Sequence, residues 1–286
     1  MVEPVTSEIA EATRDDALTD LELTLLLEAV LRFSGHDFTD YAQVTLKRRI
    51  DERMRAENVQ TISGLQERLL HDREALSRFI FSMSGGRGRF FADPSFFRVF
   101  RRQIAPLLRT YSFTRIWIPN CACGEDAYSI AVLLKEEGLL ERTMIYATDA
   151  SEAALAAARE GVYEIEAGDN PGVAYAATGA GLPLAELCEI GDGKLRFGED
   201  VKRHIIFAKH SLVTDGSLNE FHVIVARGVL RHFNRALQFR VHNLFLSSLI
   251  RLGFLCLGYN ESLQMTPHEG VFRRLVDDAP IYRRMR

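Results

Sequence analysis

The stretch RIWIPNCACGED, residues 115–126, decides the fold class, because a short apolar strand runs through small loop residues into a helix. Residues 144–149 (MIYATD) repeat the pattern, with a strand that ends in an acid and precedes an alanine-rich helix stopping at Gly161. Further apolar strands are expected at 205–207, 223–225 and 254–257, with a long helix after Asn234. Strands that alternate with helices predict βαβ units and a mostly parallel sheet. The fold class is therefore α/β.

The N-terminal quarter is expected to form a helical bundle. Residues 1–18 carry five acids and no sustained apolar period, which predicts a disordered or frayed leader. Thr19 and Glu22 match a capping box before a first helix, and further helices are expected at about 41–57, from Ser63 and after Asp72. The predicted domains are a leader (1–18), a helical domain (19–92) and an α/β domain (93–286). About 43 residues between Gly161 and Ile205 exceed a plain connection, which predicts a small inserted subdomain at about 165–203.

Composition excludes several classes of protein. The 286 residues carry a net charge of −4, which excludes a chain built wholly as a basic nucleic-acid binder. No apolar run approaches the length of a membrane span, and the acidic start predicts no secretory signal. The four cysteines are scattered, and Cys121 and Cys123 lack a neighbouring histidine, so neither a disulfide framework nor a metal site is expected. A reduced, cytoplasmic protein is the expectation.

A ligand is expected where the first two strands end. In an open α/β sheet the ligand crevice lies at the carboxyl ends of the strands, beside the point where strand order reverses. Gly124 and Glu125 open the helix after the first strand, and Asp149 ends the second strand about 25 residues later. That spacing suits an acid that binds the two hydroxyls of a ribose. The alternative is that the glycine is a simple turn and the acid a simple cap.

Motifs elsewhere in the chain extend this pattern. They lie, in order, at residues 89–97, 117–129, 146–149, 161–163, 221–230 and 257–263. In order and spacing they resemble the CheR family of chemotaxis receptor methyltransferases, over roughly residues 20–285. The resemblance implies a helical domain that docks the receptor, a Rossmann-like domain that binds S-adenosylmethionine, and a small β-subdomain that binds a receptor tail peptide. It also implies methylation of receptor glutamates, in which a carboxylate oxygen attacks the sulfonium methyl group in line and needs no general base.

This chain departs from the family at several cofactor positions. Gly86 and Gly88 stand where the family has an asparagine and a threonine, and Ala92 stands where it has an arginine. Asn120 replaces a glycine of the nucleotide loop, where a side chain is expected to intrude on the cofactor, and Cys123 replaces a threonine.

Two later motifs have also changed. The family's His-Asn-Leu is here His210-Ser211-Leu212, and Gly228 replaces another asparagine. The residues that match the family are Gly124, Glu125, Asp149 and Arg227. Each lost hydrogen bond weakens binding by about 0.5–1.5 kcal/mol, so S-adenosylmethionine is expected to bind weakly or not at all. A non-catalytic signalling module is therefore predicted; the alternative is an active protein-glutamate methyltransferase.

Arginines gather at the same positions. Under the resemblance, Arg87, Arg89, Arg227 and Arg231 surround the mouth of the pocket. Guanidinium groups pair well with phosphate oxygens, which indicates an anionic ligand such as a phosphorylated nucleotide, for example a cyclic dinucleotide. The alternative is a solvated, mobile glycine-arginine loop. The full set of predicted pocket residues is Arg87, Arg89, Asn120, Cys121, Gly124, Glu125, Asp149, Ser211, Leu212, Arg227, Gly228 and Arg231.

A basic segment in the helical domain predicts a partner. Lys47, Arg48, Arg49 and Arg53 lie on one expected helix, which in the family faces acidic receptor helices. A chemoreceptor or a similar signalling protein is therefore the expected partner. The alternative is that these long side chains coat a solvent-exposed face.

Overall fold

The computed structural model describes residues 4–218, 220–277 and 279–286. The chain divides into two compact units, and the boundary lies between Met83 and Ser84. The sequence placed this boundary after residue 92, but residues 84–92 belong to the second unit. The backbone N–H groups of Gly88 and Phe91 donate to Glu125 Oε1 and Ser129 Oγ of that unit, at 2.9 and 3.1 Å. Side-chain acceptors far along the chain therefore decide where the boundary lies.

The first unit is entirely helical within its described residues. Its helices are α1 (Pro4–Ser34), α2 (Gln43–Glu57), α3 (Ile62–His71) and α4 (Arg73–Met83). Three of them match the sequence prediction closely. Buried leucines and aromatic residues of α1, α2 and α4 form its core, among them Leu26, Leu46 and Phe79.

Helix α1 corrects the prediction of a disordered leader. The helix begins at Pro4, so the prediction is wrong from residue 4 to residue 18, while residues 1–3 lie outside the described residues. Alanine and glutamate favour helix without requiring an apolar face, so a missing apolar period does not exclude a helix. Because α1 runs through Thr19, no capping box forms there. Glu22 Oε1 instead accepts hydrogen bonds from the backbone N–H and the hydroxyl of Ser63, at 3.2 and 2.5 Å.

The second unit is built on a seven-stranded sheet in the order β6-β2-β1-β7-β8-β10-β9. Its first five strands pair in parallel, and β10 pairs antiparallel with both neighbours, as the mostly parallel prediction requires. The strands are β1 (Thr114–Pro119), β2 (Thr143–Asp149), β6 (Ile205–Lys209), β7 (Phe221–Ala226), β8 (Leu249–Leu257), β9 (Phe272–Arg274) and β10 (Ile281–Arg284).

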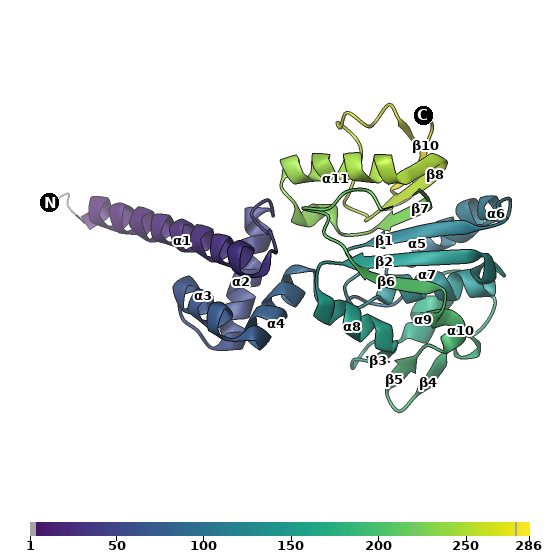
Figure 1. Ribbon diagram of the computed structural model, residues 1–286, viewed down its shortest axis with the longest axis horizontal. Helices are drawn as coiled ribbons and strands as arrows, with labels where there is room; N and C mark the ends of the chain where they lie inside the picture. Colours follow the sequence, from purple (N-terminus) through teal and green to yellow (C-terminus); the bar gives the residue numbers. More distant parts are fainter. Residues whose placement is uncertain (1–3, 219, 278) are drawn as a thin grey trace. The chain divides into compact units, whose positions relative to one another are not determined.

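Helices cover this sheet. Those of the second unit are α5 (Pro94–Val99), α6 (Ala105–Leu108), α7 (Glu125–Glu136), α8 (Glu152–Glu160), α9 (Pro171–Ala176), α10 (Glu199–Lys202) and α11 (Arg235–Ser248). Helices α7 and α8 pack against β2, and α11 packs against β8 (Figure 1). Trp117 lies fully buried at the centre of the sheet, where its indole N–H donates to Thr148 Oγ1 at 2.9 Å. The described helices include none long and apolar enough to cross a membrane.

The long segment after α8 forms the predicted inserted subdomain. Its three-stranded antiparallel sheet has the order β3-β5-β4, with β3 (Val162–Glu164), β4 (Glu189–Gly191) and β5 (Lys194–Arg196). The prediction of a small antiparallel element is confirmed, and its first strand begins three residues before the expected range. The α/β fold with a helical N-terminal unit is therefore as the sequence predicts.

Candidate functional site

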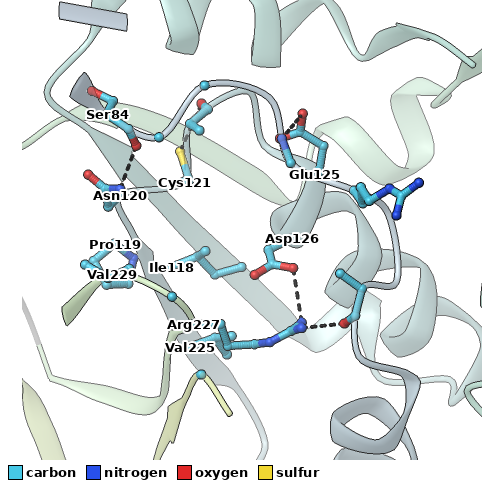
Figure 2. A pocket seen from close by; sticks show the side chains of 18 of the residues that line it. Ser84, Ile118, Pro119, Asn120, Cys121, Glu125, Asp126, Val225, Arg227 and Val229 are labelled. Atoms are coloured by element: carbon cyan, nitrogen blue, oxygen red, sulfur yellow. Dashed lines mark hydrogen bonds and ion pairs between the residues drawn. The ribbon is translucent and has the colours of Figure 1, made fainter. Parts of the chain in front are cut away.

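A cavity of about 380 Å³ lies at the carboxyl ends of the neighbouring strands β1, β7 and β8. Its walls come from the segment 84–93, from β1 and the loop into α7 (118–126), and from the loops after β7 and β8 (Figure 2). This is the edge at which ligands bind in open α/β sheets. The observed cavity shares the end of β1 with the predicted crevice, but it extends toward β7 and β8 and not to the end of β2.

Most of the predicted pocket residues line this cavity. They are Arg87, Arg89, Asn120, Cys121, Glu125, Arg227, Gly228 and Arg231. Gly124, Asp149, Ser211 and Leu212 lie outside its lining. Gly124 is the N-cap of α7, with φ at +91°, and a Cβ at this position would lie 3.1 Å from side-chain atoms of Ala158 and Phe207. Glycine is needed at this position because the backbone turns with a positive φ and the neighbouring side chains leave little room for a Cβ.

Asn120 does not project into open space. Its φ is +53°, the left-handed conformation that a glycine adopts freely and that asparagine tolerates. Its Nδ2 donates to the carbonyl oxygen of Ser84 at 2.8 Å, across the cavity wall (Figure 2). Ala122 and Asp93, also on the lining, have positive φ too. Strained backbone of this kind concentrates at functional sites.

Asp149 is sealed beneath the loop. Its carboxylate is fully buried, and it accepts hydrogen bonds from the backbone N–H groups of Ala122 and Ser151, at 2.9 and 2.8 Å. The Ser84 side chain hydrogen-bonds to it as well. Burial raises the pKa of Asp149, an effect that these hydrogen bonds oppose. The acid expected to bind a ribose therefore accepts hydrogen bonds from the protein itself and is closed to solvent.

Glu125 is similarly engaged. The residue is 4% exposed, and burial raises its pKa, while the hydrogen bond from Gly88 opposes the rise. Because Gly88 donates its backbone N–H to this carboxylate, the segment before α5 lies directly over the start of α7. A ligand that used Glu125 would first have to displace that segment.

The four arginines differ in what they contact. Arg227 is 9% exposed and ion-paired with Asp126 at 3.2 Å, and its guanidinium lies 4.5 Å from the centre of the Phe96 ring. It also donates to the carbonyl oxygen of Ala92, so its hydrogen-bonding is largely satisfied internally (Figure 2). Arg89 is exposed and paired with Asp169 of the inserted subdomain.

Two arginines on the lining keep their guanidinium groups available. Arg87 and Arg231 are exposed, and among the described residues the structure gives neither side chain an ion pair or hydrogen bond. They approach the cavity from different segments, the stretch before α5 and the loop after β7. The site therefore presents two exposed guanidinium groups without an ion pair among the described residues, although the charge of Arg87 also acts on Glu125.

Glu261 is a residue of this site that sequence reasoning missed. Its carboxylate accepts hydrogen bonds from the backbone N–H groups of Gly258, Gly228 and Arg231, at 2.7, 3.0 and 3.1 Å. It thereby ties the loop after β7 to the loop after β8. The sequence placed Glu261 in a family motif, but no local signal identified its partners some thirty residues away.

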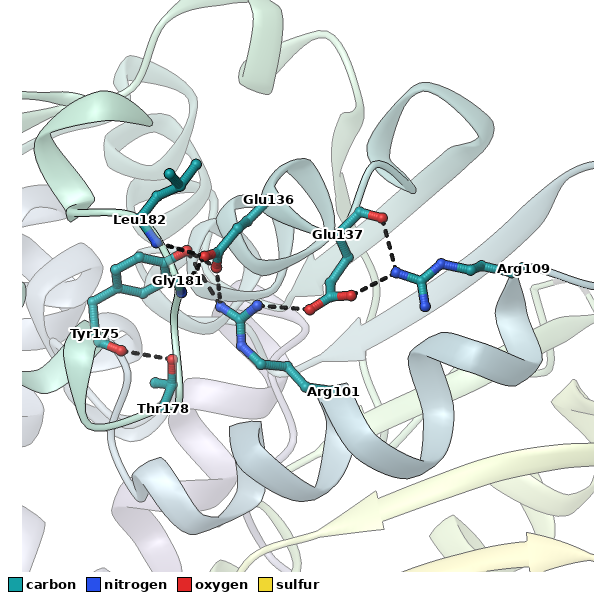
Figure 3. A network of polar contacts seen from close by, with 8 residues as sticks. All are labelled: Arg101, Arg109, Glu136, Glu137, Tyr175, Thr178, Gly181 and Leu182. Atoms are coloured by element: carbon teal, nitrogen blue, oxygen red, sulfur yellow. Dashed lines mark hydrogen bonds and ion pairs between the residues drawn. The ribbon is translucent and has the colours of Figure 1, made fainter.

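A second cavity, of about 470 Å³, lies between residues 87–94 and the inserted subdomain. Residues 163–174 form much of its other wall. The inserted subdomain is fastened to α7 through Glu136, which accepts hydrogen bonds from Gly181 and Leu182 backbone N–H groups and from the Tyr175 hydroxyl (Figure 3). Arg101 completes this network by pairing with Glu136 and Glu137.

The predicted docking residues of α2 divide into two groups. Lys47 and Arg48 are about half exposed and pair with Asp20 and Glu52, at 3.0 and 2.7 Å. Arg49 is 4% exposed and donates to the carbonyl oxygen of Met83.

Arg53 is also turned inward, since its side chain is 15% exposed and pairs with Glu57 at 3.2 Å. The prediction that Arg49 and Arg53 face a partner is therefore wrong for this conformation. Carboxylate and carbonyl acceptors inside the first unit bind them instead.

Comparison with known families and proteins identifies relatives of both units. Residues 87–276 match the model of the CheR methyltransferase SAM-binding domain, and residues 21–84 match that of the CheR all-alpha domain. A protein of Pseudomonas putida that carries the name methyltransferase Cher3 is 37% identical over 93% of this chain and 97% of its own length. A chemotaxis protein methyltransferase of Listeria innocua is 27% identical over 86% of this chain and 92% of its own. One of Vibrio parahaemolyticus is 34% identical over 52% of this chain and 54% of its own.

Proposed function

This chain belongs to the CheR methyltransferase family, and from that premise we propose that it is a chemotaxis-signalling module that binds S-adenosylmethionine weakly or not at all. It acts through a protein partner instead of through methyl transfer. The observation that carries the proposal is the engagement of Asp149, whose carboxylate accepts Ala122 N–H and Ser151 N–H and is fully buried.

The residues around the cavity fit S-adenosylmethionine poorly in this conformation. The methyl donor carries a positive sulfonium, and Arg87, Arg89 and Arg231 bring positive charge to a lining that also holds Asp93, Glu125 and Asp126. The two carboxylates that would attract the donor, Asp149 and Glu125, hold hydrogen bonds from the protein's own backbone. A ligand that displaced those backbone donors would leave them unpaired, and an unpaired buried donor costs about 1–3 kcal/mol.

The helical unit supports a protein partner. Lys47, Arg48 and Arg55 are exposed on α2, whereas Arg49 and Arg53 are turned inward. Asp20 and Glu52 pair with Lys47 and Arg48, so this face carries charges of both signs. An acidic helical surface of a chemoreceptor, or of a similar signalling protein, would pair with these basic side chains in place of Asp20 and Glu52. Charge complementarity of this kind mainly raises the association rate and the specificity.

Calorimetry with S-adenosylmethionine and S-adenosylhomocysteine tests the proposal. We expect no measurable binding, or a Kd weaker than about 100 μM, and no transfer of labelled methyl groups to receptor glutamates. A Kd near ~1 μM, about −8 kcal/mol, would refute the proposal. Together with methyl transfer it would establish the other reading, an active S-adenosylmethionine-dependent protein-glutamate O-methyltransferase.

A phosphorylated nucleotide is a second candidate ligand, favoured by the unpaired guanidinium groups of Arg87 and Arg231. Gly85 and Gly86 add open backbone beside them, since a side chain at either position would meet no atom within 4 Å. A nucleotide panel in a thermal-shift assay, at low and moderate salt, tests this, because a ligand of the folded state raises its stability. Binding should weaken with salt and in Arg87→Ala and Arg231→Ala, but not in the control Arg203→Ala. An absence of any shift would exclude this candidate.

A further inference from the structure

The segment before α5 has two parts with different packing. Residues 84–89 (SGGRGR) contain three glycines, two of which have positive φ, at +116° for Gly85 and +70° for Gly86. The next two residues are aromatic anchors: Phe91 is fully buried 4.8 Å from the Tyr175 ring centre, and Phe90 lies 4.8 Å from that of Tyr163. One end of the segment is therefore held by apolar packing, which residues 85–89 lack.

Residues 84–89 are held over the cavity by a few polar contacts. Asn120 Nδ2 donates to Ser84 O at 2.8 Å, and the Ser84 side chain hydrogen-bonds to Asp149. Gly88 N–H donates to Glu125 Oε1 at 2.9 Å. Each of these contacts occupies a polar group at or beneath the cavity wall.

The last contact fastens residues 84–89 to the inserted subdomain. Arg89, whose side chain is 73% exposed, pairs with Asp169 in the loop before α9. Exposed ion pairs contribute little, and glycine-rich backbone regains conformational freedom when it is released. Opening of residues 84–89 should therefore need much less free energy than unfolding of the second unit.

We propose that residues 84–89 form a displaceable strap, latched by the Arg89–Asp169 pair, that keeps ligands from Glu125 until it opens. Phe90 and Phe91 remain packed in the protein while the strap moves. The inference rests on the proposed function, because it supplies the physical cause of weak S-adenosylmethionine binding. When the strap opens, Glu125 Oε1 loses the hydrogen bond from Gly88 N–H and becomes an acceptor for a ligand that donates hydrogen bonds.

Hydrogen exchange and limited trypsin digestion test whether the strap opens. Asp169→Ala removes the latch, and Glu166→Ala removes an exposed carboxylate from the same loop without touching Arg89. In Asp169→Ala we expect exchange of Gly88 N–H, and cleavage after Arg87, to rise about fivefold, as for loss of an ion pair of about 1 kcal/mol. Glu166→Ala should match the wild type. Equal rates in all three proteins would overturn the strap.

Calorimetry with S-adenosylhomocysteine tests whether the strap excludes ligands. The double variant Asn120→Gly/Asp169→Ala removes both the latch and the hold on Ser84, and glycine accepts the positive φ at position 120, so the fold should persist. Because Asn120→Gly also removes a side chain from the cavity lining, the reference is the single variant Asn120→Gly, and we expect the double variant to bind about fivefold tighter than that reference. Faster exchange without tighter binding would overturn the strap as the barrier, and leave weak binding by the wild type intact.

Binding of S-adenosylhomocysteine by the wild type distinguishes failure of the proposed function from failure of the strap. Tight binding by the wild type would refute weak binding. If S-adenosylhomocysteine then increased cleavage after Arg87, the strap would be supported as a segment that opens around ligand. If cleavage did not change, both inferences would be overturned.

Discussion

Glu136 should be a principal support of the inserted subdomain. Its side chain is 8% exposed, and it accepts hydrogen bonds from Tyr175, Gly181 N–H and Leu182 N–H while pairing with Arg101, which is 9% exposed (Figure 3). Breaking a buried pair by removing one partner costs about 3–5 kcal/mol. Because Arg101 keeps Glu137 as a second partner, the lower end applies, about 3 kcal/mol for Glu136→Ala.

The loss should appear in thermal and urea unfolding of the second unit, Ser84–Arg286. For a unit of this size 1 kcal/mol lowers Tm by about 2–4 °C, so Glu136→Ala should lower it by about 6–12 °C. The matched control is Glu141→Ala, whose side chain is 76% exposed and pairs with Arg203, and for which we expect no resolvable change in Tm. If Glu136→Ala lost no more than Glu141→Ala, the reasoning about this network would be wrong.

The same network predicts a pH dependence. Although burial alone would raise it, hydrogen bonds from Tyr175, Leu182 and Gly181 and the charge of Arg101 lower the pKa of Glu136. A carboxyl whose pKa is lower in the folded state stabilises the fold above its unfolded pKa, and the contribution is lost as pH falls below it. The free-energy difference between the wild type and Glu136→Gln should therefore shrink as pH decreases below about 4.5. A difference that stayed constant down to pH 3 would contradict this assignment.

Three further outcomes are expected. Burial lowers the pKa of His242 to about 4, so the free energy of unfolding should fall by up to about 3 kcal/mol as pH decreases from about 6.5 to 4, and His242→Gln should lose this slope in urea titrations. Arg227→Ala should lower the free energy of unfolding of the second unit by about 2–3 kcal/mol, because the ion pair and the ring contacts of Arg227 are lost. Arg231→Ala should change this free energy by less than about 0.5 kcal/mol, and equal effects of the two variants would contradict the internal role of Arg227. Arg49→Ala should lower the stability of the helical unit by about 1–3 kcal/mol, measured by circular dichroism, and Arg48→Ala should not; the reverse order would show that Arg49 is not held inside.

The sequence determined the architecture because the signals for it are local. Apolar runs of strand length, small residues before α7 and the acid that ends β2 all lie within a few residues of the elements they define. The inserted antiparallel sheet was predictable from the excess length of one connection. Motif order along the chain also carried the family, which depends on residue types and spacing alone.

The tertiary structure decided the state of the site, because the relevant partners lie far apart in the chain. Asn120 hydrogen-bonds to Ser84, and Arg227 pairs with Asp126, about 100 residues away. The sequence placed the arginines and acids at one sheet edge, but it could not say which charges neutralise one another there. Asp149 is the clearest example: its position after β2 is a local signal, whereas its burial depends on donors contributed by two other segments. Hydrogen bonds are short-range and directional, so only the folded chain determines which polar groups are left for a ligand.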